Sequence, residues 1–150
     1  MVPEHSSYKR PESVLVLVCT RAGDVLLLER TRPRGFWQSV TGSLKWGESP
    51  ADAARRELRE ETGLDVRPVD LRSGASFAIV PPWRARYAPH ARVNREHWFV
   101  VELPARRTIH INRHEHRQFR WLPFAQAAAR ASSWTNRLAI RRWSGRYAPR

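Results

Sequence analysis

Three glutamates, Glu57, Glu60 and Glu61, are the residues of this chain whose type and spacing best fit a chemical role. They stand at positions i, i+3 and i+4, so a helix places all three carboxylates on one face. Like charges at this spacing destabilise a helix unless a cation lies between them. Carboxylate oxygens are hard ligands that suit Mg²⁺ or Mn²⁺, and such ions often share their remaining positions with substrate phosphates. The spacing therefore indicates metal-dependent chemistry on phosphate groups.

The glutamates belong to a longer pattern of fixed spacing. It runs Gly42, five residues, Glu48, seven residues, Arg56-Glu57-Leu58, one residue, Glu60-Glu61, one residue, Gly63-Leu64. This pattern resembles the Nudix box, and every defined position of the box matches. At average residue usage, one window matches by chance about once in 10⁹–10¹⁰. A solvated helix whose arginines pair with its glutamates is the alternative, but it does not explain Gly42, Glu48 or Gly63.

The resemblance implies a fold, a cofactor and a set of roles. The implied fold is α+β, a Nudix-type α/β/α sandwich with a mixed sheet and one catalytic helix, and the implied cofactor is Mg²⁺, with Mn²⁺ as a substitute. The implied catalytic residues are Glu57, Glu60, Glu61 and Arg56, the implied metal ligands are Glu57, Glu60, Glu61, Glu115 and the box-loop backbone at Gly42, and the implied supports of the box are Glu48 and Gly63. Glu115 also fits a plain surface residue, and this alternative stays open.

Local signals predict that the box helix runs from Pro50 to Thr62. Ser49 before a proline is typical of an N-cap followed by the first helical position. Ala51, Ala54 and Leu58 form a narrow apolar stripe suited to packing on a sheet. Gly63 follows the last helical residue, where a left-handed conformation is expected.

The rest of the chain predicts strands on either side of this helix and helices at the C-terminus. Alternation and β-branched runs predict the strands, and a Pro-rich stretch predicts a loop. The expected strands are 13–20, 25–29, 36–41, 73–80, 97–103 and 119–122, the loop covers 81–89, and the expected helices are 125–131 and 134–143. Such an order fits an α+β protein or a three-layer α/β/α sandwich.

Composition predicts one globular domain, 1–150, with frayed ends at about 1–6 and 144–150. The longest apolar run, 14–19, is too short to span a bilayer, and the N-terminus shows no apolar signal region. The single cysteine, Cys19, excludes an internal disulfide framework and fits a reducing compartment. A cytoplasmic enzyme without a membrane partner is the expectation.

The net charge of +13 indicates attraction to polyanions. Lys9 and Lys45 are the only lysines, and the arginines are scattered without a basic tail. Arginine suits bidentate recognition of phosphate. A small polyphosphate substrate explains the positive charge at least as well as a nucleic-acid partner does. A general bias of the source genome toward arginine explains it too. The oligomeric state is left open.

Segments that flank the box narrow the resemblance. The segments Tyr8-Lys9-Arg10-Pro11, Phe36-Trp37-Gln38-Ser39-Val40-Thr41-Gly42, Arg86-Tyr87-Ala88-Pro89 and Ser133-Trp134-Thr135-Asn136-Arg137 are similar to the bacterial Nudix family that hydrolyses dihydroneopterin triphosphate in folate synthesis. The similarity covers about 8–143; the stretches 77–86 and 103–114 depart from it. It implies hydrolysis to a monophosphate and pyrophosphate. The implied substrate-binding residues are Lys9, Arg30, Phe36, Trp37, Thr41, Phe77, Ala78, Ile79, Val80, Ser133, Asn136 and Arg137.

Each of these roles has an alternative. Lys9 and Arg30 also fit solvated charges at strand ends, and Ser133 also fits a helix N-cap alone. Phe36 and Trp37 are of a type found more often in cores than stacked on ligands. The histidines His110, His114 and His116 superficially resemble a zinc cluster, although no cysteines match them.

Two other functions compete with the leading one. The first is a broader nucleoside triphosphate or dinucleoside polyphosphate hydrolase that uses the same site. The second is a non-enzymatic nucleic-acid-binding or regulatory module that retains the Nudix fold. The intact Glu57, Glu60 and Glu61 argue against the second, because a binding module needs no metal-clustering face.

Overall fold

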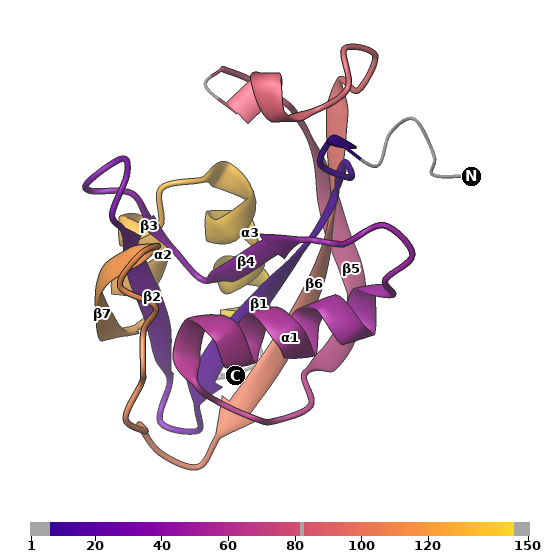
Figure 1. Cartoon of the computed structure of the whole chain (residues 1–150). Coiled ribbons are helices and arrows are strands. Elements are labelled where there is room, and N and C mark those ends of the chain that lie inside the picture. Colours follow the sequence, from indigo (N-terminus) through magenta and orange to yellow (C-terminus); the bar gives the residue numbers. More distant parts are fainter. Residues whose placement is uncertain (1–6, 82, 146–150) are drawn as a thin grey trace.

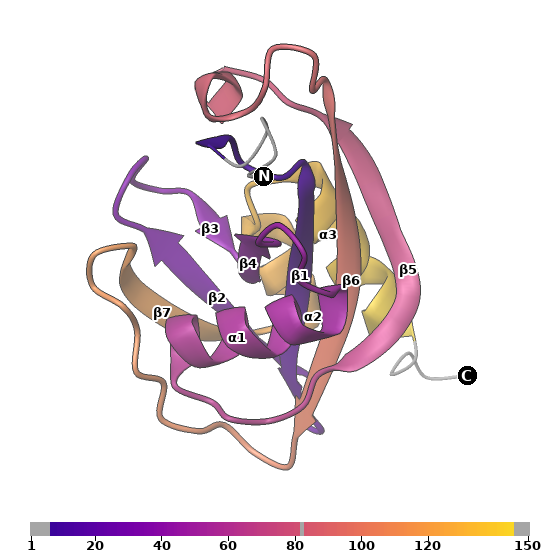
Figure 2. The same ribbon diagram turned by 45° about the vertical axis from the view of Figure 1, so that its right-hand side comes forward.

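The computed structural model describes residues 7–81 and 83–145 as three layers. A mixed sheet lies between helix α1 (Pro50–Thr62) and the pair α2 (Phe124–Arg130) and α3 (Trp134–Ser144). In Figures 1 and 2, α1 lies in front of the sheet and α2 and α3 lie behind it. The expected α/β/α sandwich with a mixed sheet is confirmed.

The sheet has seven strands in the described part of the chain. They are β1 (Glu12–Thr20), β2 (Asp24–Arg30), β3 (Trp37–Gln38), β4 (Val40–Ser43), β5 (Val69–Ala78), β6 (Val93–Leu103) and β7 (His116–Pro123). The order is β3-β2-β1-β6-β5, with β4 also paired to β1 and β7 to β2. The β1–β6 pair is parallel and the other pairs are antiparallel.

Strand β1 is buried on both faces, which explains its unbroken apolar run. Because side chains alternate along a strand, Val14 and Val16 enter the core beside α1, while Leu15 and Leu17 enter the core beside α2 and α3. Packing in these two cores holds α1 on one face of β1 and the pair α2 and α3 on the other face.

Helix α1 begins and ends where its sequence predicts. The Ser49 hydroxyl accepts a hydrogen bond from the Asp52 amide at 3.2 Å, and Gly63 adopts φ 78° as the C-terminal cap. The predicted apolar stripe is wrong at one position: Ala51 is exposed, and Ala53 packs in the core instead. The buried face of the helix consists of Ala53, Ala54, Leu58, Glu61 and Thr62, so it is rotated relative to the predicted stripe.

Other elements differ from their predicted bounds. The predicted strand 36–41 is split at Ser39, because β3 pairs with β2 and β4 pairs with β1. Strands β5 and β6 begin earlier than predicted, and their register shifts between Asp70 and Gly74. The Pro-rich loop contains a 3₁₀ helix, η2 (Trp83–Arg86).

The predicted frayed ends lie mostly outside the described residues, except that Ser144 is the last residue of α3. The prediction of one domain stays a prediction. Within the described chain, none of the helices combines the length and apolar character needed to cross a membrane.

Candidate active site

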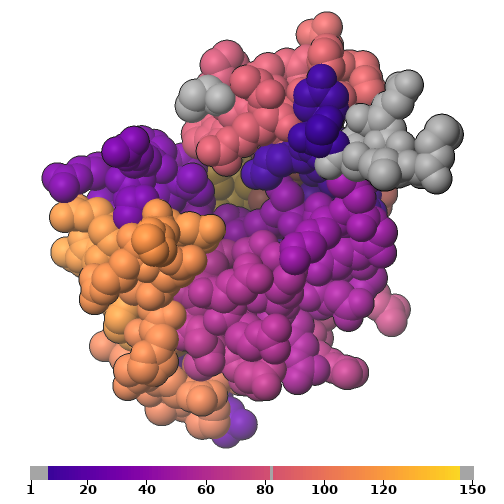
Figure 3. Space-filling view, in the orientation of Figure 1, coloured from indigo at the N-terminus to yellow at the C-terminus, as the bar shows by residue number. Residues whose placement is uncertain are grey.

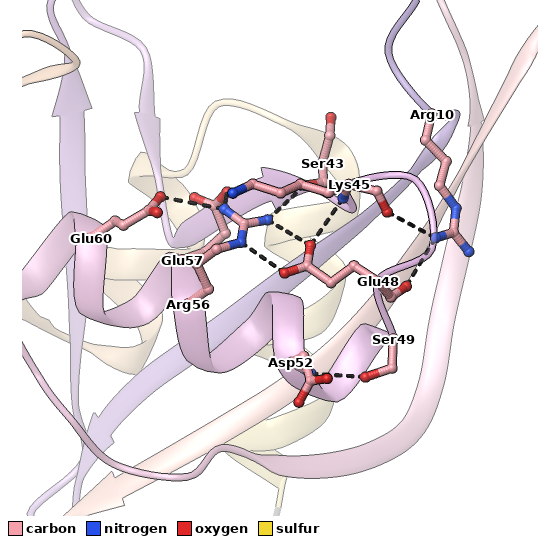
Figure 4. A network of polar contacts seen from close by, with 9 residues as sticks. All are labelled: Arg10, Ser43, Lys45, Glu48, Ser49, Asp52, Arg56, Glu57 and Glu60. Atoms are coloured by element: carbon pink, nitrogen blue, oxygen red, sulfur yellow. Dashed lines mark hydrogen bonds and ion pairs between the residues drawn. The ribbon is translucent and has the colours of Figure 1, made fainter. Parts of the chain in front are cut away.

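Arg56, in the second turn of α1, is the centre of a network of carboxylates (Figure 4). Its Nε and Nη2 donate to the two carboxylate oxygens of Glu48, each at 2.8 Å. Its Nη1 donates to Glu57 at 2.7 Å and to Glu60 at 3.3 Å. Its Nη2 also donates to the Ser43 carbonyl at 3.2 Å. One planar guanidinium thus ties the box loop to the acidic helix face.

The box loop, which follows β4 and ends at Glu48, is held by further hydrogen bonds from Lys45 and Arg10. The Lys45 amide donates to the Glu48 carboxylate at 2.9 Å. The Arg10 guanidinium donates to the carbonyls of Lys45 and Glu48 (Figure 4). Hydrogen bonds and charge from Arg56 keep the pKa of Glu48 below its ordinary value. In this geometry Glu48 pairs with Arg56 and is bonded to the box loop, an arrangement that fits the supporting role predicted from the sequence.

Gly42 in β4 lies directly against the carboxyl group of Glu57. A Cβ atom at Gly42 would overlap that carboxyl group, so only glycine leaves room for it. Burial raises the pKa of Glu57, while its contacts with Glu61 and Arg56 oppose the rise. The Glu57 carboxyl group therefore fills the space that a side chain at position 42 would need.

Glu61 is the most unusual carboxylate in the described chain. It is 1% exposed, and neither of its carboxylate oxygens has a hydrogen-bond partner among the described residues. Burial, followed by the proximity of Glu57 and the charge of Glu115, raises its pKa well above the ordinary value, and the Thr41 backbone opposes the rise. A buried polar atom without a partner costs about 1–3 kcal/mol, so such an atom calls for a ligand or a role.

The His116 side chain lies beside Glu61, and its Nε2 is 3.6 Å from the carboxylate. Burial, with the charge of Arg30, lowers the pKa of His116 to about 4. Its Nε2 lies 3.2 Å from the Gln38 amide nitrogen. Because a neutral imidazole carries no positive charge, His116 does not compensate the negative charge of Glu61. That charge must be compensated by another group.

Glu60 differs from the two other box glutamates. Its side chain is 51% exposed and reaches Arg56 from the solvent side. Glu57, Glu60 and Glu61 do not gather into a ready-made cluster of three metal-binding side chains in the described residues. Arg56 holds Glu57 and Glu60, while Glu61 lies deeper.

Lys9, Arg30 and Glu115 surround this face, although they are far apart in the sequence. The charges of Glu57, Glu115 and Arg30 all act on the Lys9 ammonium group, whose pKa is lowered chiefly by burial. Glu115 also acts on Glu61. The fold thus brings the predicted phosphate-binding cations and the carboxylate outside the box to one place.

Two residues of the β5–β6 loop (79–92), Arg86 and Tyr87, also lie beside Lys9; they belong to the segment Arg86-Tyr87-Ala88-Pro89 that the sequence resemblance singles out. The Lys9 amide donates to the Arg86 carbonyl at 2.9 Å. The Lys9 ammonium group lies 5.8 Å from the centre of the Tyr87 ring. The loop therefore holds Lys9 in place through its backbone and an aromatic face.

A hollow opens above α1 (Figure 3). It is bordered by the β2–β3 loop, the β5–β6 loop and the segment leading into β1, and atoms of the α3 region are visible at its bottom. The rings of Phe36 and Trp83 lie 6.1 Å apart and connect the two loops at the rim. Phe36 is half-buried there, so its predicted contact with a substrate ring stays a prediction.

The structure corrects the role predicted for Trp37. Its side chain is 5% exposed and packs in the core beside α2 and α3. The guanidinium groups of Arg120 and Arg130 lie 5.4 and 5.3 Å from its ring centre. A ring occupied in this way is a core aromatic and does not stack on a substrate.

Three predicted substrate residues at the start of α3 have hydrogen-bond partners within the protein, and their contact with a substrate stays a prediction. The Ser133 hydroxyl accepts from the Asn136 amide at 3.2 Å and caps the helix. The Asn136 side chain is fully buried, accepts from the Ser39 amide at 2.7 Å and donates to the Ser39 hydroxyl at 2.9 Å. Arg137 donates to the carbonyls of Ala131 and Ser132. The Asn136 contacts position the turn between β3 and β4, while those of Ser133 and Arg137 fix the start of α3.

The predicted segment 77–80 lies at the end of β5 and the start of the β5–β6 loop. Phe77 is half-buried, Ile79 is buried, and Ala78 and Val80 are exposed. Phe77 pairs with Asn94 across β5 and β6, so the two side chains share one face of the sheet. Alternate residues of this segment, Phe77 and Ile79, are therefore the ones turned toward the protein interior.

A mixed sheet between two helical layers, with an arginine-centred acidic helix entered through a glycine loop, defines the class of Nudix hydrolases. Residues 9–143 match the family model of the NUDIX domain, and the chain belongs to this family. Membership confirms the Nudix resemblance drawn from the box.

Two curated relatives and one solved structure extend this result. The dihydroneopterin triphosphate diphosphatase of Escherichia coli K12 is 42% identical over 139 residues, covering 89% of this chain and 91% of that protein. The diphosphatase of the same name from Haemophilus influenzae is 35% identical, covering 91% and 89%. The structure of the E. coli dihydroneopterin triphosphate pyrophosphohydrolase superposes with a TM-score of 0.84 at 41% identity, covering 91% and 96%.

Proposed function

We propose that this Nudix hydrolase cleaves dihydroneopterin triphosphate to dihydroneopterin monophosphate and pyrophosphate. The observation that carries the proposal is the 42% identity, over most of both chains, to a relative named for this substrate. The intact network of Arg56, Glu48 and Glu57 supports an enzyme over a binding module. We place the reaction in the cytoplasm, in keeping with the composition of the chain.

We propose Mg²⁺ as the cofactor, with Mn²⁺ as a substitute. Glu61 fits a cation because its buried carboxylate has no partner within the described residues, and Glu57 lies beside it one helical turn away. Glu57 and Glu61 would hold the ion with the box-loop backbone at Gly42, and Glu115 and Glu60 are further ligand candidates. A bound Mg²⁺ would polarise phosphoryl oxygens and lower the pKa of a bound water.

The residues of this chain then divide the remaining work. Lys9 and Arg30 bind the distal phosphates, since both cations lie beside the acidic face. Arg56 keeps Glu57 and the box loop in position and does not touch the substrate. The hollow beyond the acidic face takes the ring system. This arrangement leaves the inner phosphorus nearest the glutamates, so we expect water to attack the α-phosphorus.

Hydrolysis of dihydroneopterin triphosphate in ¹⁸O-labelled water tests this scheme by mass spectrometry. Label in the monophosphate product is the expected result. Label in pyrophosphate, or orthophosphate as the primary product, overturns it. A substrate panel with nucleoside triphosphates and dinucleoside polyphosphates, each with and without Mg²⁺, tests the proposed substrate against the broader hydrolase.

A further inference from the structure

The sheet face that packs against α3 becomes polar at one end. Along β6, Asn94 and Glu96 share a face with Trp98, which lies in the apolar core beside α3. Asn94 is 1% exposed and Glu96 is 6% exposed. Ser13 of β1 lies opposite Glu96 and on the same face. An amide, a carboxyl and a hydroxyl group therefore stand where the rest of this face is apolar.

The protein leaves one atom of this group, the Asn94 side-chain oxygen, without a hydrogen-bond partner in the described residues. The Asn94 amide nitrogen donates to the Ser13 hydroxyl at 2.8 Å, while its Oδ1 has no hydrogen-bond partner in the described chain. The Glu96 Oε1 accepts from the Trp98 indole at 3.0 Å, and Thr135 at the start of α3 also contacts this carboxyl group. Burial raises the pKa of Glu96. An orphaned acceptor beside a buried carboxyl group is costly for the fold.

A purely structural role does not require this chemistry. A glutamine at position 96 would accept from the Trp98 indole and the Thr135 hydroxyl just as well, without burying an acid. Similarly, a serine or threonine at position 94 would bond Ser13 without an orphaned oxygen. The fold therefore requires neither the free oxygen of Asn94 nor the acid of Glu96. Their presence side by side indicates recognition of a ligand that donates hydrogen bonds.

The polar end of this face is close to the proposed active site. Ser13 pairs with Ser43 in β4, and the adjacent pair Val14–Gly42 lies against the Glu57 carboxyl group on the other face of the sheet, so the two polar regions lie at the same end of β1. Thr135 belongs to the first turn of α3, and atoms of the α3 region form the bottom of the hollow in Figure 3. A substrate with its phosphates on the acidic face and its ring in the hollow would reach toward these residues.

We propose, on the basis of the function proposed above, that Glu96 and Asn94 bind the 2-amino-4-oxopyrimidine edge of the substrate ring. On this edge the exocyclic amino group and the adjacent ring N–H form two parallel donors, which match the two oxygens of one carboxylate. The Asn94 Oδ1 accepts a further N–H of the ring or its amino group. Pterins and guanine present this edge, whereas adenine, cytosine and hypoxanthine do not present both donors. Glu96 and Asn94 therefore select pterin and guanine rings over the other bases.

Comparing two nucleotides that differ only in the 2-amino group tests this inference on the wild-type protein. GTP carries the amino group and ITP lacks it, while their phosphates and remaining ring atoms are the same. We expect kcat/KM to fall about tenfold from GTP to ITP, the scale of leaving a buried acceptor unpaired. Equal kcat/KM for the two nucleotides overturns the inference.

The variant Glu96→Gln provides the second arm, and Glu102→Gln is its matched control because Glu102 is exposed on the same strand. Glu96→Gln should lower kcat/KM about tenfold for dihydroneopterin triphosphate and GTP, while ATP and ITP change less than about twofold. The control should leave all four unchanged. A uniform loss on every substrate means that Glu96 is structural, and the inference is then wrong.

Binding of neopterin in metal-free buffer, followed by its fluorescence, gives a readout without catalysis. Wild type should bind it about tenfold more tightly than Glu96→Gln or Asn94→Ser. Equal affinities contradict the inference. If wild type turns over no dihydroneopterin triphosphate but still prefers GTP to ITP, the proposed function fails and the ring-edge inference stands. If the pterin is turned over and Glu96→Gln has no effect, the proposed function stands and the ring-edge inference fails.

Discussion

At the level of single residues, Glu61 and Glu57 are held in a state that favours a cation. Both lie against the sheet, both have raised pKa values from burial, and both would carry negative charge in one confined place. Arg56 compensates only the Glu57 side of the pair. The charge that Arg56 does not reach is concentrated on Glu61.

We therefore expect Glu57→Gln and Glu61→Gln each to reduce kcat by at least about 10²-fold, the scale of losing a key electrostatic group. Glu61→Gln should unfold in EDTA at the same temperature as wild type or higher, because a neutral isostere removes a buried acid. The rise in melting temperature caused by Mg²⁺ should be lost in this variant. Differential scanning fluorimetry and steady-state kinetics measure these effects, and wild-type rates in both folded variants would refute the assignment.

The role of Arg56 depends on its shape and not only on its charge. Its two parallel bonds to Glu48 and its bonds to Glu57 and the Ser43 carbonyl use a planar fork. Lysine keeps the positive charge but cannot make these contacts together. Arg56→Lys should therefore lose activity about tenfold or more while remaining folded by circular dichroism. Arg55→Lys is the matched control, since Arg55 forms an exposed pair with Asp65; equal activity of the two variants would contradict the role of the fork.

At the level of elements, the start of α3 works as a clamp on the sheet. Asn136 supplies both ends of its amide to Ser39, which separates β3 from β4. The box loop begins directly after β4, so the position of the acidic face depends in part on this contact.

Asn136→Ala should therefore destabilise the protein and not weaken substrate binding directly. Removing the amide leaves the buried Ser39 N–H without a partner, which costs about 1–3 kcal/mol of unfolding free energy. Urea denaturation measures this loss, and KM measured well below the melting temperature should change less than about threefold. A large rise in KM at unchanged stability would restore the substrate-binding role expected from the sequence.

At the level of the whole molecule, the parallel pair β1–β6 joins the two halves of the sheet. Glu12 at the start of β1 accepts from His97 of β6 at 2.8 Å and from Arg10 at 2.9 Å. Arg10 in turn holds the box loop. One carboxylate thus connects the centre of the sheet with the acidic site.

This connection predicts a component of acid unfolding. The hydrogen bond from His97, with help from Arg10, lowers the pKa of Glu12 below its ordinary value of 4.5. The stabilisation is therefore present at neutral pH and is lost as the pH falls below 4.5 through the folded-state pKa. Glu12→Gln should be less stable than wild type at pH 7, and the difference should shrink by about pH 3, as followed by thermal melts. A difference that stays constant with pH would show that ionisation of Glu12 does not contribute.

The sequence by itself determined the features that depend on short spacings. The cap at Ser49, the left-handed Gly63 and the glutamates at i, i+3 and i+4 are local, because one helical turn brings such residues together whatever surrounds them. The box also identified the family, and its match to the NUDIX domain confirms this. The fold class followed from the same pattern.

Only the tertiary structure decided which of the flanking residues are buried and paired inside the protein. Trp37 and Asn136 belong to segments that resemble a substrate site. The Trp37 ring lies against the guanidinium groups of two arginines. Asn136 is hydrogen-bonded to Ser39, which is 97 positions away in the sequence. Glu96 likewise lies in an alternating strand, and its buried carboxyl group contacts Thr135 of α3, which comes much later in the sequence. Burial and partnership are set by contacts between distant segments, and no local periodicity encodes them.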